Sequence, residues 1–334
     1  MKSEFRDKMS CRKRVFVLSL CSFFLFFFSG HDLSWAQQQG YPNKPIRIII
    51  PTGPGGVSDL SVRVMADYLT AELKVPIIID NKIGANGMIA GSTALKADPD
   101  GYTILASSDA SMIHGPLESP NPPYNSFRDF LTVGAYGVAP HVYTVYASSP
   151  FKTIVDFVNE AKKTPGKLSV GVTQLDSRLK VEKFKKVAGI NVKIIPMPRV
   201  PELVSALIGK HIDLMGLSYA GSYPYIKSGE IRVLFSNFRI PGQSAPTLAE
   251  AGYPDAGTVV IRNAFSVSAK TPKPVYEKLV VTFERVAKKP DLHKKWEAMG
   301  IMPDYMSPAE FNADMKKKWD NESNLMEELG LIKK

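Results

Sequence analysis

The chain has 334 residues, a formal net charge of +10 and only two cysteines. This basic balance favours anionic partners in general. The lysines, however, occur in short clusters within helical patterns, and no nucleic-acid motif accompanies them, so we expect no nucleic-acid partner.

The first 36 residues have the pattern of a secretory signal. Three basic residues precede an apolar run, Val15–Phe28, and Ser34-Trp35-Ala36 has the small-x-small form of a cleavage site. The run has about 14 residues, whereas crossing a bilayer takes roughly 20, which disfavours a permanent anchor. Lipidation at Cys21 is disfavoured because the bulky Leu20 precedes it. We expect residues 1–36 to be removed on export.

The remaining 298 residues are long enough for two lobes with substantial cores. Both cysteines, Cys11 and Cys21, lie in the signal segment, so we expect the exported chain to be stabilised by its core alone. The signal carries six basic and three acidic residues, which leaves a net charge of about +7 on the exported part.

Short apolar runs alternate with amphipathic helices from Ile46 onward. The predicted strands are 46–50, 77–79 and 102–106, with a helix between successive strands. This order predicts a parallel sheet, and right-handed crossovers deliver the loops after these strands to one sheet edge. Those loops cover residues 51–58, 81–88 and 107–111. Ligands of open α/β sheets sit at that edge.

A second α/β set follows Pro150. We predict helices at 154–162, 179–188 and 202–209, and strands at 168–172, 192–195, 214–217 and 232–236. The corresponding edge loops are 173–178, 196–201 and 218–223. This set predicts a second lobe with its own ligand-facing edge.

Two long extended segments, 130–146 and 259–269, flank the second set and are interpreted as crossings between lobes. Helices at 273–288 and 308–329 then return to the first lobe. The predicted fold class is therefore α/β, with two α/β lobes joined by two hinge crossings that can close on a ligand. We place lobe 1 at 37–138 plus 265–334, and lobe 2 at 139–264.

The loop Pro51-Thr52-Gly53-Pro54-Gly55-Gly56 leads from a strand into a helix. Glycines let the backbone approach a ligand, and the helix N-terminus offers unpaired N–H groups to an anion. It is neither a Walker loop nor a GxGxxG motif. Alone, this loop fits a ligand-free turn equally well. However, Asn81–Gly87 forms a second glycine-bearing helix entrance after the next strand, and two such entrances can hold one carboxylate between them.

The sequence predicts no enzyme, no metal site and no cofactor. The histidines of the exported part, His114, His141, His211 and His293, are scattered without metal-ligand spacing. No Gly-x-Ser-x-Gly elbow occurs, and no cysteine is available as a nucleophile after export. A secreted hydrolase is therefore disfavoured.

Four motifs in this order resemble the Bug (TctC-like) receptors of tripartite tricarboxylate transporters. They are Tyr41–Ile46 with the PTGPGG loop, Asp80–Gly87, Pro99–Ile104 and Pro246–Gly252. The resemblance covers essentially the whole exported chain. It implies a type II periplasmic-binding-protein fold and a carboxylated solute held between the lobes in the periplasm. It also implies delivery to membrane permease subunits, and we expect the receptor to be a monomer.

By position, the resemblance implies that the first-lobe loops contact one carboxylate of the ligand. The implied contacts are Thr52, Gly53, Gly55, Gly56 and Ser58 in the first loop, Gly84, Ala85, Asn86 and Gly87 in the second, and Ser107 and Ser108 in the third. Thr52 stands where an aromatic residue is usual, and Asn86 adds a side-chain amide to the second loop.

The second lobe departs further from the family pattern. The helix entrance that begins at Thr173 lacks the usual glycines, and Leu217 replaces a common acid, which argues against an amino-acid ligand. Arg178 and Arg199 each fit a surface residue or a partner for a distal carboxylate. An aromatic or apolar monocarboxylate framed by Tyr219 and Tyr223 fits as well as a dicarboxylate, so both ligand classes stay open. A signalling or orphan receptor that docks on a membrane sensor is the alternative function.

Overall fold

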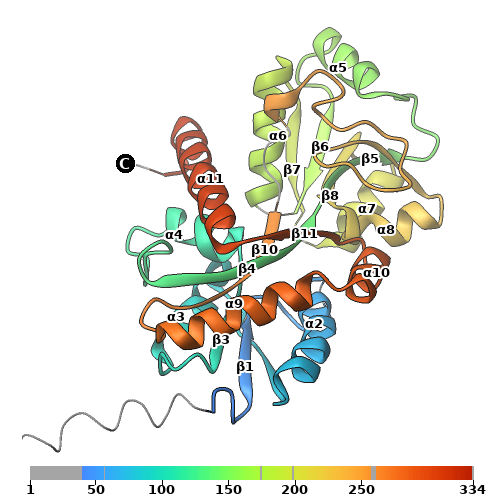
Figure 1. Ribbon diagram of the computed structural model, residues 1–334. Helices are drawn as coiled ribbons and strands as arrows, with labels where there is room; N and C mark the ends of the chain where they lie inside the picture. Colours follow the sequence, from blue (N-terminus) through green and yellow to red (C-terminus); the bar gives the residue numbers. More distant parts are fainter. Residues whose placement is uncertain (1–39, 56, 174, 198, 257–260, 333–334) are drawn as a thin grey trace, which may run out of the picture. The chain divides into compact units, whose positions relative to one another are not determined.

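The computed structural model describes residues 40–332 except positions 56, 174, 198 and 257–260 (Figure 1). The predicted signal segment, 1–36, and Gly56 of the first loop lie outside the described residues. Lys44–Lys334 form one unit that holds two separate sheets. Within the described ranges, no helix combines the length and the apolar character needed to cross a membrane.

The first sheet contains six strands in the order β11-β4-β10-β3-β1-β2. They are β1 (Ile46–Ile50), β2 (Ile77–Asn81), β3 (Thr103–Ser108), β4 (Phe130–Ala139), β10 (Ile261–Ser268) and β11 (Met302–Met306). β1 pairs in parallel with both β2 and β3, which confirms the predicted β-α-β-α-β arrangement. β10 pairs antiparallel to β3 and β4, so a segment late in the chain lies at the centre of this sheet.

The helical segments that accompany the first sheet come from both ends of the chain. They are α2 (Val57–Leu73), η1 (Ala85–Gly87), α3 (Met88–Lys96), the π-helical η2 (Ala110–His114), α4 (Gly115–Glu118), α9 (Lys273–Ala287), α10 (Pro290–Ala298) and α11 (Pro308–Glu328). The apolar stripe predicted for α2 is buried at Val62, Met65, Ala66, Leu69 and Leu73. One face of this helix therefore packs into the core, as its 3.6-residue periodicity predicts.

The second sheet contains five strands in the order β7-β6-β8-β5-β9. They are β5 (His141–Tyr146), β6 (Ser169–Val172), β7 (Lys193–Pro196), β8 (Leu214–Ser218) and β9 (Ile231–Ser236). The helical segments of this part are α5 (Ile154–Lys163), α6 (Leu175–Ala188), α7 (Val200–Ile208), α8 (Tyr219–Lys227) and η3 (Pro254–Ala256). β6 is parallel to β7 and β8, whereas β5 is antiparallel to β8 and β9.

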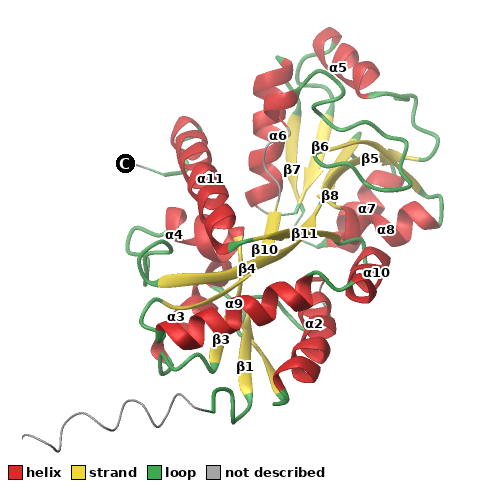
Figure 2. Ribbon diagram, in the orientation of Figure 1, coloured by secondary structure: helices red, strands yellow, loops and turns green. Residues whose placement is uncertain are grey.

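Helices cover both faces of the second sheet (Figure 2). On one face, Val170 and Val172 of β6 pack with Phe184 of α6. On the other face, Leu217 of β8 packs with Leu203 of α7. Each face thus has its own apolar core. α6 begins just after the carboxyl end of β6.

Two second-lobe segments predicted as loops are helical. α6 begins at Leu175 rather than at residue 179, because Asp176 lies in its first turn and pairs with Lys180 one turn later. α8 begins at Tyr219, where the Ser218 hydroxyl caps the helix by accepting a bond from the Gly221 N–H at 3.3 Å. Arg178 and Tyr219 are therefore helical residues.

Only Pro140 separates β4 of the first sheet from β5 of the second. Proline has no N–H to donate to a ladder, so the extended segment predicted over 130–146 divides at this residue. The second crossing returns to the first sheet at β10, and the expected lobe boundary between residues 264 and 265 falls inside that strand. Around the first crossing, a small core forms from Val138, Val142, Tyr219, Ile240 and Met302.

The sequence pattern does not predict α10, β11 or η2. β11 reads MPDYM, which has neither strict alternation nor a continuous apolar run. In the order of the described strands it lies at an edge, where Pro303 is tolerated.

Candidate functional site

The three edge loops of the first lobe converge at Gly87. This residue has φ +86°, and a Cβ atom there would lie 2.7 Å from Cβ of Ser111 and 3.1 Å from Cβ of Pro51. Pro51 belongs to the first loop, and Ser111 follows β3 in η2. Glycine is therefore required both by the left-handed backbone and by the close approach of two neighbouring loops.

The first loop is fastened by the buried carboxylate of Asp59. It accepts hydrogen bonds from the Gly55 N–H at 3.0 Å, Arg63 Nε at 2.7 Å and Asn81 Nδ2 at 2.8 Å. Burial alone would raise the pKa of Asp59, but the bonds from Arg63, Asn81 and Gly55 together lower it. Asn81 also donates to the Thr52 carbonyl at 2.8 Å, which ties the first loop to the second.

Not all of the predicted first-loop donors are available to an anion. The Gly55 N–H points to Asp59, so a ligand could recruit it only by displacing that carboxylate. By contrast, the Thr52 hydroxyl is buried and makes no hydrogen bond within the described part of the chain. Gly53 and Ser58 are half-buried. A buried hydroxyl that lacks a partner is costly, which marks Thr52 as a site where a further polar group belongs.

The second loop has an unusual backbone. Gly84, Ala85, Asn86 and Gly87 all have positive φ, at +132°, +47°, +48° and +86°. Non-glycine residues pay about 1–2 kcal/mol each for a left-handed conformation. The Asn86 side chain donates to the carboxylate of Glu118 in α4, so the added amide already has a partner. Ala85 and Asn86 are exposed, and Gly84 is half-buried.

Ser107 and Ser108 are the last residues of β3 rather than loop residues. The Ser107 hydroxyl is buried and lies 3.2 Å from the carbonyl of Ala264 and 3.0 Å from the hydroxyl of Ser266. It is therefore committed to β10. The Ser108 N–H donates to Ser111 Oγ at 3.1 Å, and the side chain of Ser108 is half-buried.

The predicted second-lobe residues lie in different surroundings. Thr173 and Arg178 are half-buried at the entrance of α6. The Arg199 side chain is 78% exposed and pairs with Glu202 at 3.4 Å, as expected for a surface arginine. Tyr219 is buried in the core around the first crossing, and its hydroxyl accepts from Gln243 at 3.3 Å. Arg199 is thus an exposed, paired residue, whereas Arg178 is half-buried.

Two buried ion pairs fasten η2 and the residue before it to α11. Lys318 Nζ lies 3.1 Å from Asp109, and His114 Nε2 lies 2.6 Å from Glu322. Burial opposes the charge of His114, but the bond to Glu322 and its negative charge raise the pKa of His114 above 6.5. These partners are more than 200 residues apart in the sequence, so no local pattern announces them.

Sequence reasoning also missed an ion pair at the second-lobe edge. Asp176 and Lys180 lie 2.8 Å apart, and their side chains are 12% and 3% exposed. Burial would raise the pKa of Asp176, but the positive charges of Lys180 and His114 lower it. His114 belongs to η2 of the first lobe, so Asp176 lies where the two lobes meet. The spacing of four residues on a helix was the available signal.

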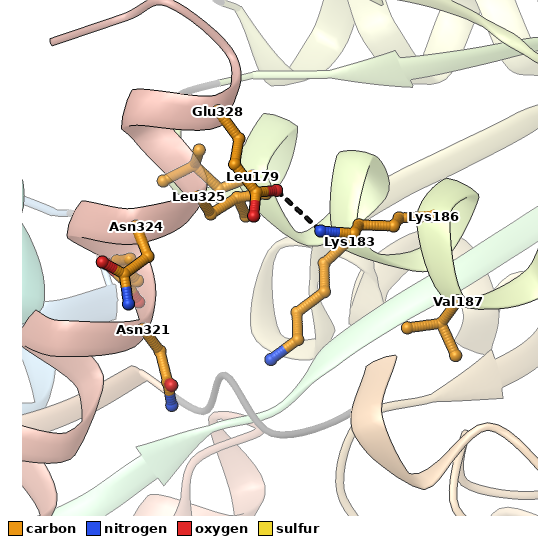
Figure 3. Close-up of a pocket in the computed structure, with 9 residues that line it drawn as sticks. Leu179, Lys183, Lys186, Val187, Asn321, Asn324, Leu325 and Glu328 are labelled. Carbon is orange, nitrogen blue, oxygen red and sulfur yellow. Dashed lines mark hydrogen bonds and ion pairs between the residues drawn. The ribbon is translucent and has the colours of Figure 1, made fainter.

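A separate cavity of about 250 Å³ lies between α6 and α11 (Figure 3). Its lining residues are Leu179, Lys183, Lys186, Val187, Asn321, Glu322, Asn324, Leu325 and Glu328. Figure 3 shows the Lys186 ammonium beside the Glu328 carboxylate, and this pair measures 2.7 Å. None of the described residues that were predicted to bind ligand lines this cavity.

Two α/β lobes joined by two crossings, with glycine-bearing helix entrances at a shared edge, define a solute-binding protein. A family model described as "Tripartite tricarboxylate transporter family receptor" (TctC) matches residues 61–331, and the chain belongs to that family. This is a family of periplasmic solute-binding receptors and not of enzymes.

Relatives of known sequence and structure agree with this assignment. Protein BugT from Bordetella pertussis (strain Tohama I) is 29% identical over 296 residues, which span 84% of this chain and 88% of BugT. A solved periplasmic transporter is 29% identical, with a TM-score of 0.74 over 87% of this chain and 99% of that one. An R. palustris protein solved with adipate shares the fold at 24% identity, with a TM-score of 0.75 over 87% and 98% of the two chains.

Proposed function

We propose that this receptor captures a small organic carboxylate between its lobes and delivers it to the permease subunits of a tripartite tricarboxylate-type transporter. The observation that carries the proposal is the meeting of three edge loops at Gly87, the first of which leads into α2. Helix N-termini favour anions through their unpaired N–H groups and their dipole. The family description, which names tricarboxylate transport, supports the same ligand chemistry.

The Thr52 hydroxyl gives the proposed carboxylate a specific partner. It is buried in the first loop, and among the described residues it has no hydrogen-bond partner. The further proposed contacts are Gly53, Gly56, Ser58, Gly84, Ala85, Gly87 and Ser108 in the first lobe, and Thr173 and Arg178 in the second. Gly55, Asn86 and Ser107 have other partners, so they join the ligand only if those bonds exchange.

Closure would bring lobe 1, residues 37–138 plus 265–334, onto lobe 2, residues 139–264. A ligand that contacts both lobes stabilises the closed form by the free energy of contacts made only in that form. We further propose that residues 1–36 direct export and are removed, and that the receptor works in the periplasm as a monomer.

Calorimetry on the purified chain from residue 37 to 334 tests ligand capture. A panel of aliphatic and aromatic mono-, di- and tricarboxylates should include at least one acid that binds with measurable heat. Thr52→Val should weaken that acid by about tenfold, because the variant keeps the size of the side chain and removes the hydroxyl. Native mass spectrometry of protein purified without refolding would reveal a retained acid by its mass. An absence of heat across the whole panel would refute the carboxylate proposal.

Delivery to a permease needs a separate experiment. Crosslinking of the liganded receptor in membranes should capture permease subunits, and omission of ligand should reduce the yield. Capture of a sensor protein in their place would favour the signalling alternative.

A further inference from the structure

The second lobe carries a buried polar cluster at the edge formed by the carboxyl ends of β6 and β8. Asp176 and Lys180 come from the first two turns of α6, and His141 is the first residue of β5. His141 pairs with Ser218 at the end of β8, so it lies at the same sheet edge as the entrance of α6.

The His141 ring extends over its neighbouring strand because that strand carries a glycine. A Cβ atom on Gly216 would lie 3.0 Å from His141 Nε2. In the sheet order, β8 lies between β5 and β6. A ring that extends from β5 over β8 therefore lies on the side of β6, the strand that leads into α6. The ring also packs edge-on against Tyr143, with centroids 5.1 Å apart.

Two buried polar atoms, one in this cluster and one beside it, have unmet hydrogen-bonding capacity. His141 is 2% exposed and Tyr143 is 1% exposed, and neither His141 Nε2 nor the Tyr143 hydroxyl has a hydrogen-bond partner in the described ranges. Buried polar groups of this kind are normally satisfied by protein, water or ligand. Burial, together with the charge of Lys180, lowers the pKa of His141 to about 3, so the imidazole is neutral at physiological pH.

The cluster is within reach of the first lobe. α6 contacts both η2 and α11, and the charges of Asp176 and His114 act on each other across the lobes. η2 also carries Ser111, which lies against Gly87 at the convergence of the first-lobe loops. η2 thus contacts both the convergence of the first-lobe loops and α6, the helix that carries Asp176.

We propose that Asp176, Lys180 and His141 form the subsite for the end of the ligand distal from its carboxylate, and that this subsite selects an uncharged group that both donates and accepts hydrogen bonds, such as a hydroxyl. This inference rests on the proposed function. It assigns specificity to residues of α6 and β5 rather than to the exposed Arg199.

The chemistry of the ion pair decides the ligand class. Lys180 has three N–H donors and Asp176 is an acceptor, so a hydroxyl placed beside the pair satisfies one donor and one acceptor together. A second carboxylate would lie against the charge of Asp176, and an ammonium group would lie against that of Lys180. Because the buried pair already neutralises itself, either charged ligand group placed beside it would lose its hydration and gain no counter-charge from the pair.

Two matched series of acids test this inference on the chain from residue 37 to 334. One series is benzoate, 4-hydroxybenzoate and terephthalate, and the other is hexanoate, 6-hydroxyhexanoate and adipate. Two series are used because the span between the subsites differs for rigid and flexible acids. In the series that binds, calorimetry should show the hydroxy acid binding at least about tenfold more tightly than its unsubstituted and diacid analogues.

Substitution of Asp176 gives the most specific result. Asp176→Asn should leave Lys180 with an uncompensated charge and so raise the ratio of diacid to hydroxy-acid affinity by about tenfold or more. Lys180→Met should abolish the preference for the hydroxy acid without any gain for the diacid. Arg199→Met is the matched control and should leave every ratio unchanged, since its side chain is exposed and paired with Glu202.

Affinity ratios cancel a general loss of binding, and thermal melting checks that each variant is folded. Asp176→Ser repeats the test with a smaller side chain. If the wild type binds none of the six acids or any other carboxylate of the wider panel, the proposed function itself fails. If acids bind but the hydroxy acid is not preferred, or neither Asp176 variant changes the ratio, the distal subsite is overturned and carboxylate capture stands.

Discussion

The convergence of loops at Gly87 makes a quantitative prediction for Gly87→Ala. The variant meets two penalties in the folded state. Alanine at φ +86° is in the left-handed region, which costs about 1–2 kcal/mol. Its Cβ would also lie 2.7 Å from Ser111 and 3.1 Å from Pro51, and displacing packed neighbours costs typically about 1–3 kcal/mol.

Gly189→Ala separates these two penalties. Gly189 has φ +61°, and a Cβ atom there would meet nothing within 4 Å. This control therefore carries the left-handed penalty alone. Both variants lose the same unfolded-chain freedom, and this contribution cancels in their comparison. The free energy of unfolding should fall by about 1–3 kcal/mol more for Gly87→Ala than for Gly189→Ala.

Urea denaturation of the chain from residue 37 to 334 measures both free energies. Calorimetry with the acid that binds best should show, in addition, that only Gly87→Ala impairs binding, because only this substitution forces the three loops apart. Equal losses of stability in the two variants would refute the argument that the loops meet at Gly87.

Three smaller predictions concern buried and exposed charges. His141 has a pKa lowered to about 3, so its contribution to stability is full above pH 6.5 and is lost as the pH falls toward 3, with a slope of at most about 1.4 kcal/mol per pH unit. In urea denaturation measured between pH 7 and 4, His141→Asn should remove this dependence of the unfolding free energy on pH. An unchanged slope in the variant would contradict the assignment to His141. His114 has a raised pKa, so its contribution is full below pH 6.5 and is lost as the pH rises through the folded-state value. Glu322→Gln should reduce this loss of unfolding free energy as the pH rises. If the loss is as large in the variant, the His114–Glu322 pair is not its cause. Lys186 and Glu328 are 65% and 55% exposed, so a double-mutant cycle should give a coupling below about 1 kcal/mol, and a larger coupling would contradict the surface assignment.

Local patterns predicted the elements that have strong apolar periodicity. The run Ile46–Ile50 became β1, and the stripe from Val62 to Leu73 became the buried face of α2. The parallel order of the first three strands followed from their alternation with helices. These features depend on residues near each other in the sequence, which explains why the sequence alone predicted them.

The candidate site was predicted less completely, because its electrostatics depend on long-range pairs. The Asp109–Lys318 and His114–Glu322 contacts join residues more than 200 positions apart. The use of the Gly55 amide by Asp59 had a local signal, an acid in the first turn of a helix and four residues after the glycine. The family resemblance supplied the candidate loops, but it could not reveal that their donors were already engaged.

The pairing of β5 decides which of its side chains lie toward α6. β5 has two buried faces: Tyr143 and Val145 belong to the core that includes Phe184 of α6, while Val142 packs on the opposite side. Successive residues of a strand alternate between faces, so a shift of β5 by one residue against β8 and β9 would turn His141 away from the face that holds Tyr143. A change in the length of the crossing at Pro140 therefore keeps His141 in place only if the register of β5 is unchanged.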